Sequence, residues 1–210
     1  MIIIFNKPYG VISQFSEHET YQSLKEFIPY KNVYPAGRLD AYSEGLIILT
    51  DNGVLQNKIS HPTNNIYKTY WAQVEDIPND TSLDILRKGV YIGDTLTKPA
   101  LVQKIDVPIL WEREPPIRVR KSIPTCWIEI KILEGRNRQV RKMTAAISHP
   151  TLRLVRTQVG EYKLDNLQPG DYLVIKKWMH IIMLSEWYNY GSIIIKGTLC
   201  QETHSVNYLH

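Results

Sequence analysis

The sequence has only two cysteines, Cys126 and Cys200, among its 210 residues. Neither belongs to a Cys-x-x-Cys pair or to a cluster with histidine, so the sequence predicts neither a disulfide framework nor a zinc site. No apolar run is long enough to span a membrane, and the opening residues MIIIF are too short for a signal peptide and lack its positive charge. These absences lead us to expect a cytoplasmic protein without disulfide, metal or membrane segment.

The sequence also lacks a glycine-rich phosphate-binding loop, a low-complexity tract and an internal repeat. Nothing in it therefore indicates a small-molecule cofactor. Its length is sufficient for one sizeable hydrophobic core, or for two small lobes that share a sheet. We expect a monomer that works without a cofactor.

Basic residues are concentrated in one part of the chain. The whole sequence has 25 lysines and arginines against 21 acids, but the window 112–142 alone has nine basic side chains against four acidic ones. The basic residues are Arg113, Arg118, Arg120, Lys121, Lys131, Arg136, Arg138, Arg141 and Lys142. This concentration is consistent with two interpretations, a solvated charged surface or a binding site for an anionic partner.

Short apolar runs alternate irregularly with a few amphipathic segments. Their composition predicts strands at residues 2–5, 46–50, 66–75, 100–105 and 126–133. Helices are predicted at residues 55–59, from an N-cap at Thr81 up to Gly89, and from about Val140 to Ile147. Because Arg138 and Arg141 are three positions apart, we expect them on one face of the last helix. Few helices among irregularly spaced strands indicate an α+β fold.

Charged residues interrupt an apolar, glycine-bounded stretch at residues 34–53, YPAGRLDAYSEGLIILTDNG. Since residues 46–50 are predicted to be a buried strand, we expect Asp40 in the loop before it. From spacing alone, Arg38 and Asp40 are most simply a surface ion pair beside a turn, because such pairs are common. The alternative is a nucleophilic carboxylate that a buried cation keeps ionised.

The stretch GRLDAYSEGLIILTD resembles the signature of the RsuA/RluB/E/F family of ribosomal pseudouridine synthases. Further stretches resemble family motifs in the family order: NKPYG, KISHP, YKTYWAQV, EGRNRQVRKM, HPTLRLVRTQVG and LDNLQPGDY. The resemblance leads us to expect a catalytic domain at residues 1–177 and a C-terminal extension of unknown role at residues 178–210. Because the strand of IIIFNKPYG begins at the first residue, we also expect the small N-terminal S4 RNA-binding domain of several members to be missing.

The resemblance implies a fold and a reaction. The fold is a two-lobed α+β domain with a central mixed, largely antiparallel sheet and an RNA-binding cleft. The reaction is the isomerisation of a uridine of large-subunit ribosomal RNA to pseudouridine, without a cofactor. In it the bond from ribose C1′ to N1 breaks, the uracil rotates, and C5 bonds to C1′.

The resemblance also implies the site residues. Asp40 corresponds to the catalytic aspartate, Tyr70 to the ring on which the base stacks, and Arg141 to the basic partner of the aspartate. We expect Arg141 to hold Asp40 ionised through a charge-assisted hydrogen bond. Arg38 corresponds to the arginine implicated in displacing the target nucleotide. Phosphate contacts are expected for a second group, Arg136, Arg138 and Lys142.

Other functions stay open at this point. The chain is also consistent with a ribosome-assembly factor that binds RNA without catalysis, or with a pseudouridine synthase that acts on another structured RNA. RNA phosphodiester cleavage is a further alternative, but the sequence has no metal-binding carboxylate cluster or paired-histidine motif to support it. Without the resemblance, Tyr70 would be an ordinary strand aromatic and Arg141 a charge on a helix surface.

Overall fold

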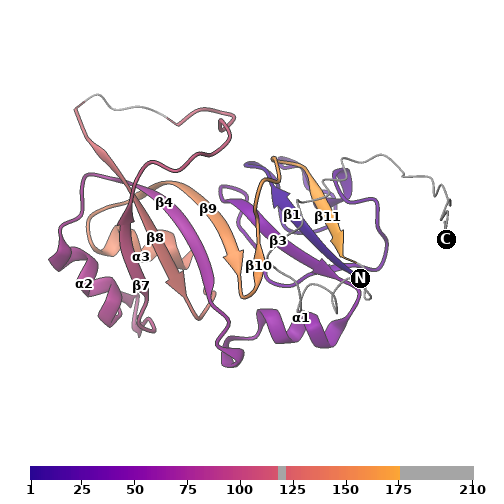
Figure 1. Cartoon of the computed structure of the whole chain (residues 1–210), viewed down its shortest axis with the longest axis horizontal. Helices are drawn as coiled ribbons and strands as arrows, with labels where there is room; N and C mark the ends of the chain where they lie inside the picture. Colours follow the sequence, from indigo (N-terminus) through magenta and orange to yellow (C-terminus); the bar gives the residue numbers. More distant parts are fainter. Residues whose placement is uncertain (118–121, 176–210) are drawn as a thin grey trace, which may run out of the picture.

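The computed structural model describes residues 1–117 and 122–175, and a nine-stranded sheet runs through its whole length (Figure 1). Seven strands follow the order β11-β1-β3-β9-β4-β8-β7, with β2 paired to β3 and β10 to β9. Their bounds are β1 Ile2–Lys7, β2 Tyr34–Pro35, β3 Glu44–Thr50, β4 Lys68–Glu75, β7 Leu101–Ile105, β8 Thr125–Ile132, β9 Thr151–Val159, β10 Tyr162–Lys163 and β11 Tyr172–Ile175. A separate hairpin is formed by β5 Tyr91–Ile92 and β6 Thr95–Leu96. The expected C-terminal extension, and Arg118, Arg120 and Lys121, lie outside the described residues.

The sheet consists of two antiparallel halves joined by one parallel pair of strands. One half contains β11, β1 and β3, and the other contains β9, β4, β8 and β7. The two halves meet where β3 runs parallel to β9, with Glu44 opposite Val155 and Gly45 opposite Arg156. The predicted α+β class with a mixed, largely antiparallel sheet is therefore confirmed.

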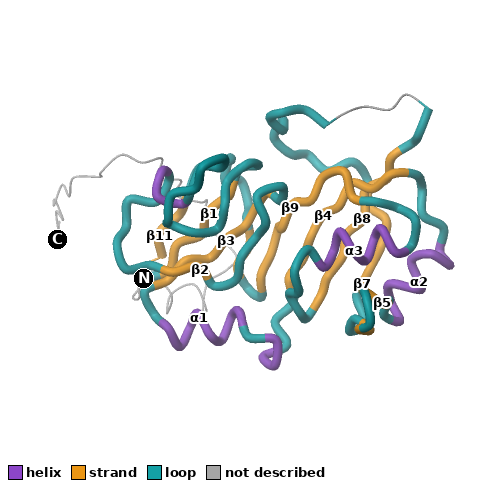
Figure 2. The backbone as a smooth tube through the Cα atoms, turned by 180° about the vertical axis from the view of Figure 1, so that it is seen from behind, coloured by secondary structure: helices purple, strands orange, loops and turns teal. Residues whose placement is uncertain are grey.

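Three α-helices lie in the described part of the chain: α1 Gly53–Ser60, α2 Asp80–Lys88 and α3 Gln139–Ala146. Short 3-10 turns occur at η1 Leu24–Glu26 and η2 Pro62–Asn64. In Figure 2, α3 lies in front of β4 and β8 and α2 beside them, whereas α1 lies below the other half in this view. Within residues 1–117 and 122–175, no helix has the length and apolar character needed to cross a membrane.

Two predictions about the helices are wrong: the N-cap of α2, and the shared helical face of Arg138 and Arg141. The N-cap of α2 is Asn79 and not Thr81, because the Asn79 side chain accepts the hydrogen bond from the backbone N–H of Ser82. Arg138 precedes α3 in a left-handed conformation, with φ of 52°, so it does not share a helical face with Arg141. The chain turns there because the side chain of Gln139 is buried and accepts a hydrogen bond from the backbone N–H of Arg136.

The pleat of the strands divides the buried side chains between two cores. On β1, Ile3 and Phe5 pack into a core on one face of the sheet, together with the buried sides of α2 and α3. Ile2 and Ile4 alternate with them and pack into the core on the other face, which α1 covers with Ile59. Each large apolar side chain removed from water in this way contributes about 1.5 to 3 kcal/mol. Packing on both faces therefore holds β1 and β3 as a rigid base for the loops that follow them.

A close backbone contact and a buried ion pair hold the two halves together at β3 and β9. Gly45 has φ of +101°, and a Cβ atom at this position would collide with the carbonyl oxygen of Arg156. Next to it, the buried carboxylate of Glu44 accepts two hydrogen bonds of 2.9 Å from Arg153 on β9 and one of 2.7 Å from Trp111. Because a buried charge is costly unless it is paired, this set of bonds fixes the position of β3 relative to β9.

Replacing Gly45 by alanine should destabilise the protein strongly. The added Cβ would collide with backbone and would also require a backbone conformation that L-residues rarely adopt, so we expect Gly45→Ala to lower the free energy of unfolding by about 2 to 3 kcal/mol. Urea titration followed by circular dichroism measures this change. Gly53→Ala is the matched control: no atom lies within 4 Å of its added Cβ, and it should change the stability by less than about 1 kcal/mol. Equal stability of both variants would contradict this account of the contact between β3 and β9, which we call the joint.

Candidate active site

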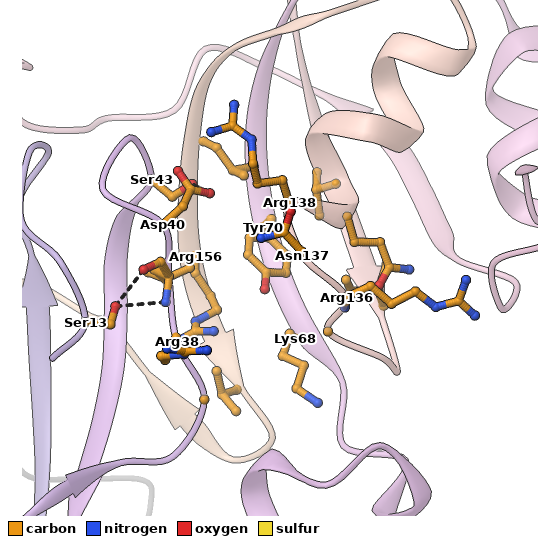
Figure 3. Close-up of a pocket in the computed structure, with 18 of the residues that line it drawn as sticks. Ser13, Arg38, Asp40, Ser43, Lys68, Tyr70, Arg136, Asn137, Arg138 and Arg156 are labelled. Carbon is orange, nitrogen blue, oxygen red and sulfur yellow. Dashed lines mark hydrogen bonds between the residues drawn. The ribbon is translucent and has the colours of Figure 1, made fainter. Parts of the chain in front are cut away.

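A cavity of about 490 Å³ lies on the sheet face where the two halves meet (Figure 3). One wall is the loop between β2 and β3, residues 36–43, and the opposite wall is formed by β4 and the turn at residues 135–140. The floor includes side chains of β9, which joins the two halves. The volume is typical of a site for one small ligand or one nucleotide.

Asp40 lies in the loop predicted for it, and hydrogen bonds fix both its carboxylate and the chain on either side. One carboxylate oxygen accepts from the backbone N–H of Tyr42 at 3.0 Å, and the other accepts from the Ser43 hydroxyl at 2.9 Å. The buried Ser13 side chain donates to the carbonyl oxygen of Leu39 at 2.7 Å and accepts from its N–H at 2.9 Å. The cavity wall therefore presents a carboxylate in a defined orientation, with its side chain 25% exposed.

Arg141 is close to Asp40, but the two side chains do not form the hydrogen bond expected from the sequence. Arg141 Nε lies 4.0 Å from an oxygen of Asp40, which is beyond hydrogen-bond distance. The guanidinium instead donates to the carbonyl oxygens of Tyr42 at 2.6 Å and Thr151 at 3.3 Å, and its Nε has no hydrogen-bond partner among the described residues. Burial lowers the pKa of Arg141, while the charge of Asp40 raises it. Asp40 and Arg141 thus interact electrostatically in this structure, without a hydrogen bond between them.

Tyr70 projects from β4 into the cavity. It is 7% exposed, and it lies directly opposite Arg156 of β9 in the pairing of the two strands. Opposed residues, and residues two apart on a strand, share one face of a sheet, so Lys68 and Arg156 lie on the same side as Tyr70. An aromatic ring and two cations therefore line the cavity together.

Lys68 and Arg156 are cavity residues that we did not predict from the sequence. Arg156 is 3% exposed, its Nε donates to the carbonyl oxygen of Leu46 at 2.8 Å, and its buried Nη2 has no hydrogen-bond partner among the described residues. Burial, and then the nearby charges of Arg156 and Lys98, lower the pKa of Lys68. Together with Arg38, these cations lie at the end of the cavity away from Asp40 (Figure 3). This end is suited to an electron-rich group of a ligand.

The three residues expected to contact phosphates are placed differently from one another. Arg136 lines the cavity and forms an ion pair of 3.0 Å with the buried carboxylate of Glu134. Arg138 also lines the cavity, is exposed, and lies with its guanidinium carbon 5.9 Å from the centre of the Tyr42 ring. Lys142 is exposed on α3 and does not line the cavity. The structure therefore brings Arg136 and Arg138 to the site, and leaves Lys142 on the neighbouring surface.

Lys7 is a buried residue that does not line the cavity but holds the turn next to the Asp40 loop. We did not predict this role from the sequence. Lys7 lies at the end of β1 with no exposed surface, and its Nζ donates to the carbonyl oxygens of Pro8 at 2.8 Å and Val11 at 2.6 Å. Burial lowers its pKa to about 7, although the charges of Asp40 and Glu44 act in the opposite direction. These bonds fix the turn after β1, in which the N–H of Gly10 donates to the carbonyl oxygen of Ala41 at 2.8 Å.

The arrangement combines an oriented carboxylate, an aromatic ring and several cations around one cavity. Such a site can bind a planar ring that belongs to an anionic polymer, and can place a carboxylate against it. Within residues 1–117 and 122–175, no cluster of three or more histidine, cysteine, aspartate or glutamate side chains is arranged to hold a metal ion.

Comparison with known proteins identifies the family. The family described as RNA pseudouridylate synthase matches residues 1–146, which is most of the chain. The chain belongs to this family. As an RNA pseudouridine synthase it is an isomerase, and the predicted family membership is confirmed.

Individual synthases resemble the chain over most of its length. Ribosomal large subunit pseudouridine synthase E of Vibrio parahaemolyticus is 53% identical over 83% of this chain and 74% of its own. The protein of the same name from Xanthomonas campestris pv. campestris is 50% identical, with 83% of this chain and 95% of its own covered. Among solved structures, a crystal structure of pseudouridylate synthase superimposes with a TM-score of 0.69 at 25% identity, and covers 85% of this chain and 71% of its own.

The buried Lys7 gives the synthase a pH-dependent stability. Its pKa in the folded state is about 7, against an ordinary value of 10.5. Between these values the unfolded chain binds more protons than the folded one, so the contribution of Lys7 to the free energy of unfolding rises with pH. Relative to Lys7→Met, the wild-type protein should gain up to about 1.4 kcal/mol per pH unit between pH 7 and 10.

Denaturant titrations of both proteins at pH 7, 8 and 9 measure this difference. The exposed Lys31 offers a matched control, since Lys31→Met should follow the wild-type pH dependence. Parallel curves for the wild type and Lys7→Met would contradict the lowered pKa.

Proposed function

We propose that the protein isomerises one uridine of large-subunit ribosomal RNA to pseudouridine, with Asp40 as its catalytic carboxylate. The observation that carries the proposal is the position of Asp40. Its carboxylate, oriented by Tyr42 and Ser43, lines a nucleotide-sized cavity whose opposite wall holds Tyr70. The names of the Vibrio and Xanthomonas relatives, 53% and 50% identical, support large-subunit ribosomal RNA as the substrate.

The cavity explains how such a substrate would be handled. A uridine within structured RNA hides its glycosidic bond, so the nucleotide must leave the base stack and enter a pocket. Tyr70 offers the ring against which the uracil stacks, and Asp40 faces the sugar side of the base. Arg38, exposed at the cavity edge, occupies the space that the nucleotide leaves.

The reaction requires bond exchange within one nucleotide and no oxidant or reductant. The bond from C1′ to N1 breaks, C5 forms a new bond to C1′, and the uracil exchanges the proton on C5 for one on N1. Negative charge develops on the uracil as it separates from the sugar. The cations Lys68 and Arg156, on the Tyr70 side of the cavity, stabilise that charge through preorganised electrostatics.

Arg141 acts on Asp40 by charge and position. Its guanidinium is held by two backbone carbonyl groups, one of which belongs to Tyr42, whose N–H binds Asp40. A small movement of the Asp40 carboxylate would convert the separation of 4.0 Å into a direct hydrogen bond.

We assign the catalytic domain to residues 1–177, and we propose that it acts as a monomer without a cofactor. Arg136, Arg138 and Lys142 are assigned to phosphate contacts.

Asp40→Asn should abolish pseudouridine formation while leaving the fold and RNA binding nearly intact. The amide keeps the shape of the side chain but lacks the nucleophilic and basic character of the carboxylate. The test uses ribosomal RNA from a strain that lacks the gene, incubated with purified protein and analysed by chemical adduct formation and primer extension. Asp84→Asn, which removes an exposed carboxylate paired with Arg87 on α2, is the matched control and should keep full activity. Appreciable turnover by Asp40→Asn would sink the assignment, and RNA binding without turnover by the wild type would favour an assembly factor.

Arg138→Ala and Arg141→Ala should fail in different ways. If Arg138 neutralises a phosphate, its loss weakens binding to cognate and non-cognate RNA alike, and lowers the log-log salt slope by roughly 0.7 to 0.9. Arg141 faces Asp40 and two carbonyl groups, so Arg141→Ala should reduce turnover far more than affinity and leave the slope little changed. Binding at several salt concentrations, with turnover alongside, separates the two roles. A wild-type salt slope for Arg138→Ala would contradict the phosphate contact of Arg138. Retained turnover for Arg141→Ala would contradict the action of Arg141 on Asp40.

A further inference from the structure

A cluster of aromatic and arginine side chains lies beside Asp40, and one of its members, Arg138, lines the cavity. Its members are Tyr9, Tyr21, Tyr42, Arg113 and Arg138, which we call the aromatic platform. The Tyr42 ring lies 5.7 Å from that of Tyr9, in a tilted arrangement, and 5.9 Å from that of Tyr21, edge to face. The guanidinium carbon of Arg113 lies 4.5 Å from the centre of the Tyr9 ring, and that of Arg138 lies 5.9 Å from the centre of Tyr42. Four separate segments of the chain therefore meet in one surface cluster.

The platform is not part of either hydrophobic core. None of its three tyrosines belongs to the buried residues of the two cores, and Tyr42 is 41% exposed. Arg113 covers the ring of Tyr9, whereas Arg138 lies at the outer limit of cation–π distance from Tyr42. Tyr42 is therefore the ring with surface left for a ligand.

Backbone hydrogen bonds tie this ring to the catalytic carboxylate. The N–H of Tyr42 donates to Asp40, and its carbonyl oxygen accepts from Arg141. The hydroxyl groups of Tyr42 and Tyr21 are 2.6 Å apart and hydrogen-bonded, which limits rotation of the exposed side chain. A group bound on Tyr42 would therefore lie at a fixed position relative to the nucleotide in the cavity.

The other side of the platform is anchored at the joint between the two halves of the sheet. Arg113 follows Trp111, whose indole N–H donates to the buried carboxylate of Glu44 and whose carbonyl oxygen accepts from Arg153. The loop between β7 and β8 is thus held against β3 and β9 by Trp111, and it places Arg113 over Tyr9. The platform is held by the same ion pair that holds the sheet together.

We propose that the aromatic platform stacks an unpaired base of the RNA next to the target uridine, and that the enzyme therefore selects uridines flanked by a single-stranded nucleotide. Exposed tyrosine rings together with arginines match the chemistry of an unstacked base and its phosphate, because every base offers a π face and every linkage a negative charge. The positive charges of Arg113 and Arg138 make an RNA a better occupant than a protein surface. This inference rests on the proposed function and names the substrate feature that the site reads.

The test measures stacking directly, with a 12-nucleotide single-stranded oligoribonucleotide that contains one 2-aminopurine, whose fluorescence falls when it stacks. Binding to the wild-type protein should quench the probe. Tyr42→Phe keeps the ring and should quench it as the wild type does, whereas Tyr42→Leu should lose the quenching and bind about 5- to 100-fold more weakly. Tyr91→Leu, at an exposed tyrosine of the β5–β6 hairpin, is the matched control and should behave as the wild type.

Two results would overturn the platform. Unchanged quenching by Tyr42→Leu would show that no base stacks there. Equal losses in Tyr42→Phe and Tyr42→Leu would show that only the hydroxyl bond to Tyr21 matters, as a structural contact. Pseudouridine formation by the wild-type protein, measured in parallel on ribosomal RNA, separates this inference from the proposed function. If the wild type is active but does not quench the probe, the platform alone is contradicted. If it quenches the probe but is inactive, the proposed function alone is contradicted.

Discussion

The parallel contact between β3 and β9 is the constraint on which the site depends. Two antiparallel half-sheets, each with its own packing, meet at only two residue pairs, where Gly45 lets the backbones approach and Glu44 is bound by Arg153. Asp40 is carried by one half and Tyr70 by the other, so the distance across the cavity is set at this joint. A buried ion pair is weak evidence for stability by itself, but it fixes one arrangement of the two halves and excludes others.

The same joint organises the charge around the cavity. Arg141 lies beside Asp40, and Arg156 lines the far end of the cavity. Both are largely buried cations, and backbone carbonyl groups accept hydrogen bonds from both. Carbonyl dipoles can hold cations in place without neutralising them, which leaves their field directed at the cavity. A base that acquires negative charge while it leaves the sugar would enter this field.

Much of the fold could be predicted from the sequence, because apolar alternation marks strands and the GRLD stretch marks the loop before β3. The predicted strand at residues 46–50 is β3, extended by two residues to Glu44. Arg156 could not be predicted as a cavity residue, because it is brought beside Tyr70 by the pairing of two distant strands, with a register shift after Thr69. The hydrogen bond expected between Arg141 and Asp40 is not formed in the structure, where the guanidinium donates to the carbonyl oxygens of Tyr42 and Thr151. The sequence does not reveal which carbonyl groups compete for a guanidinium.

The central claim is that a uridine enters this cavity and meets Asp40 and Tyr70 from opposite walls. The most direct test is a crystal structure of the Asp40→Asn protein bound to a ribosomal RNA fragment that spans the modified uridine. The account predicts that this uridine has left the base stack, with its uracil against the ring of Tyr70 and its ribose beside Asn at position 40. A target uridine that remains stacked in the RNA, or that binds outside the cavity, would contradict the account.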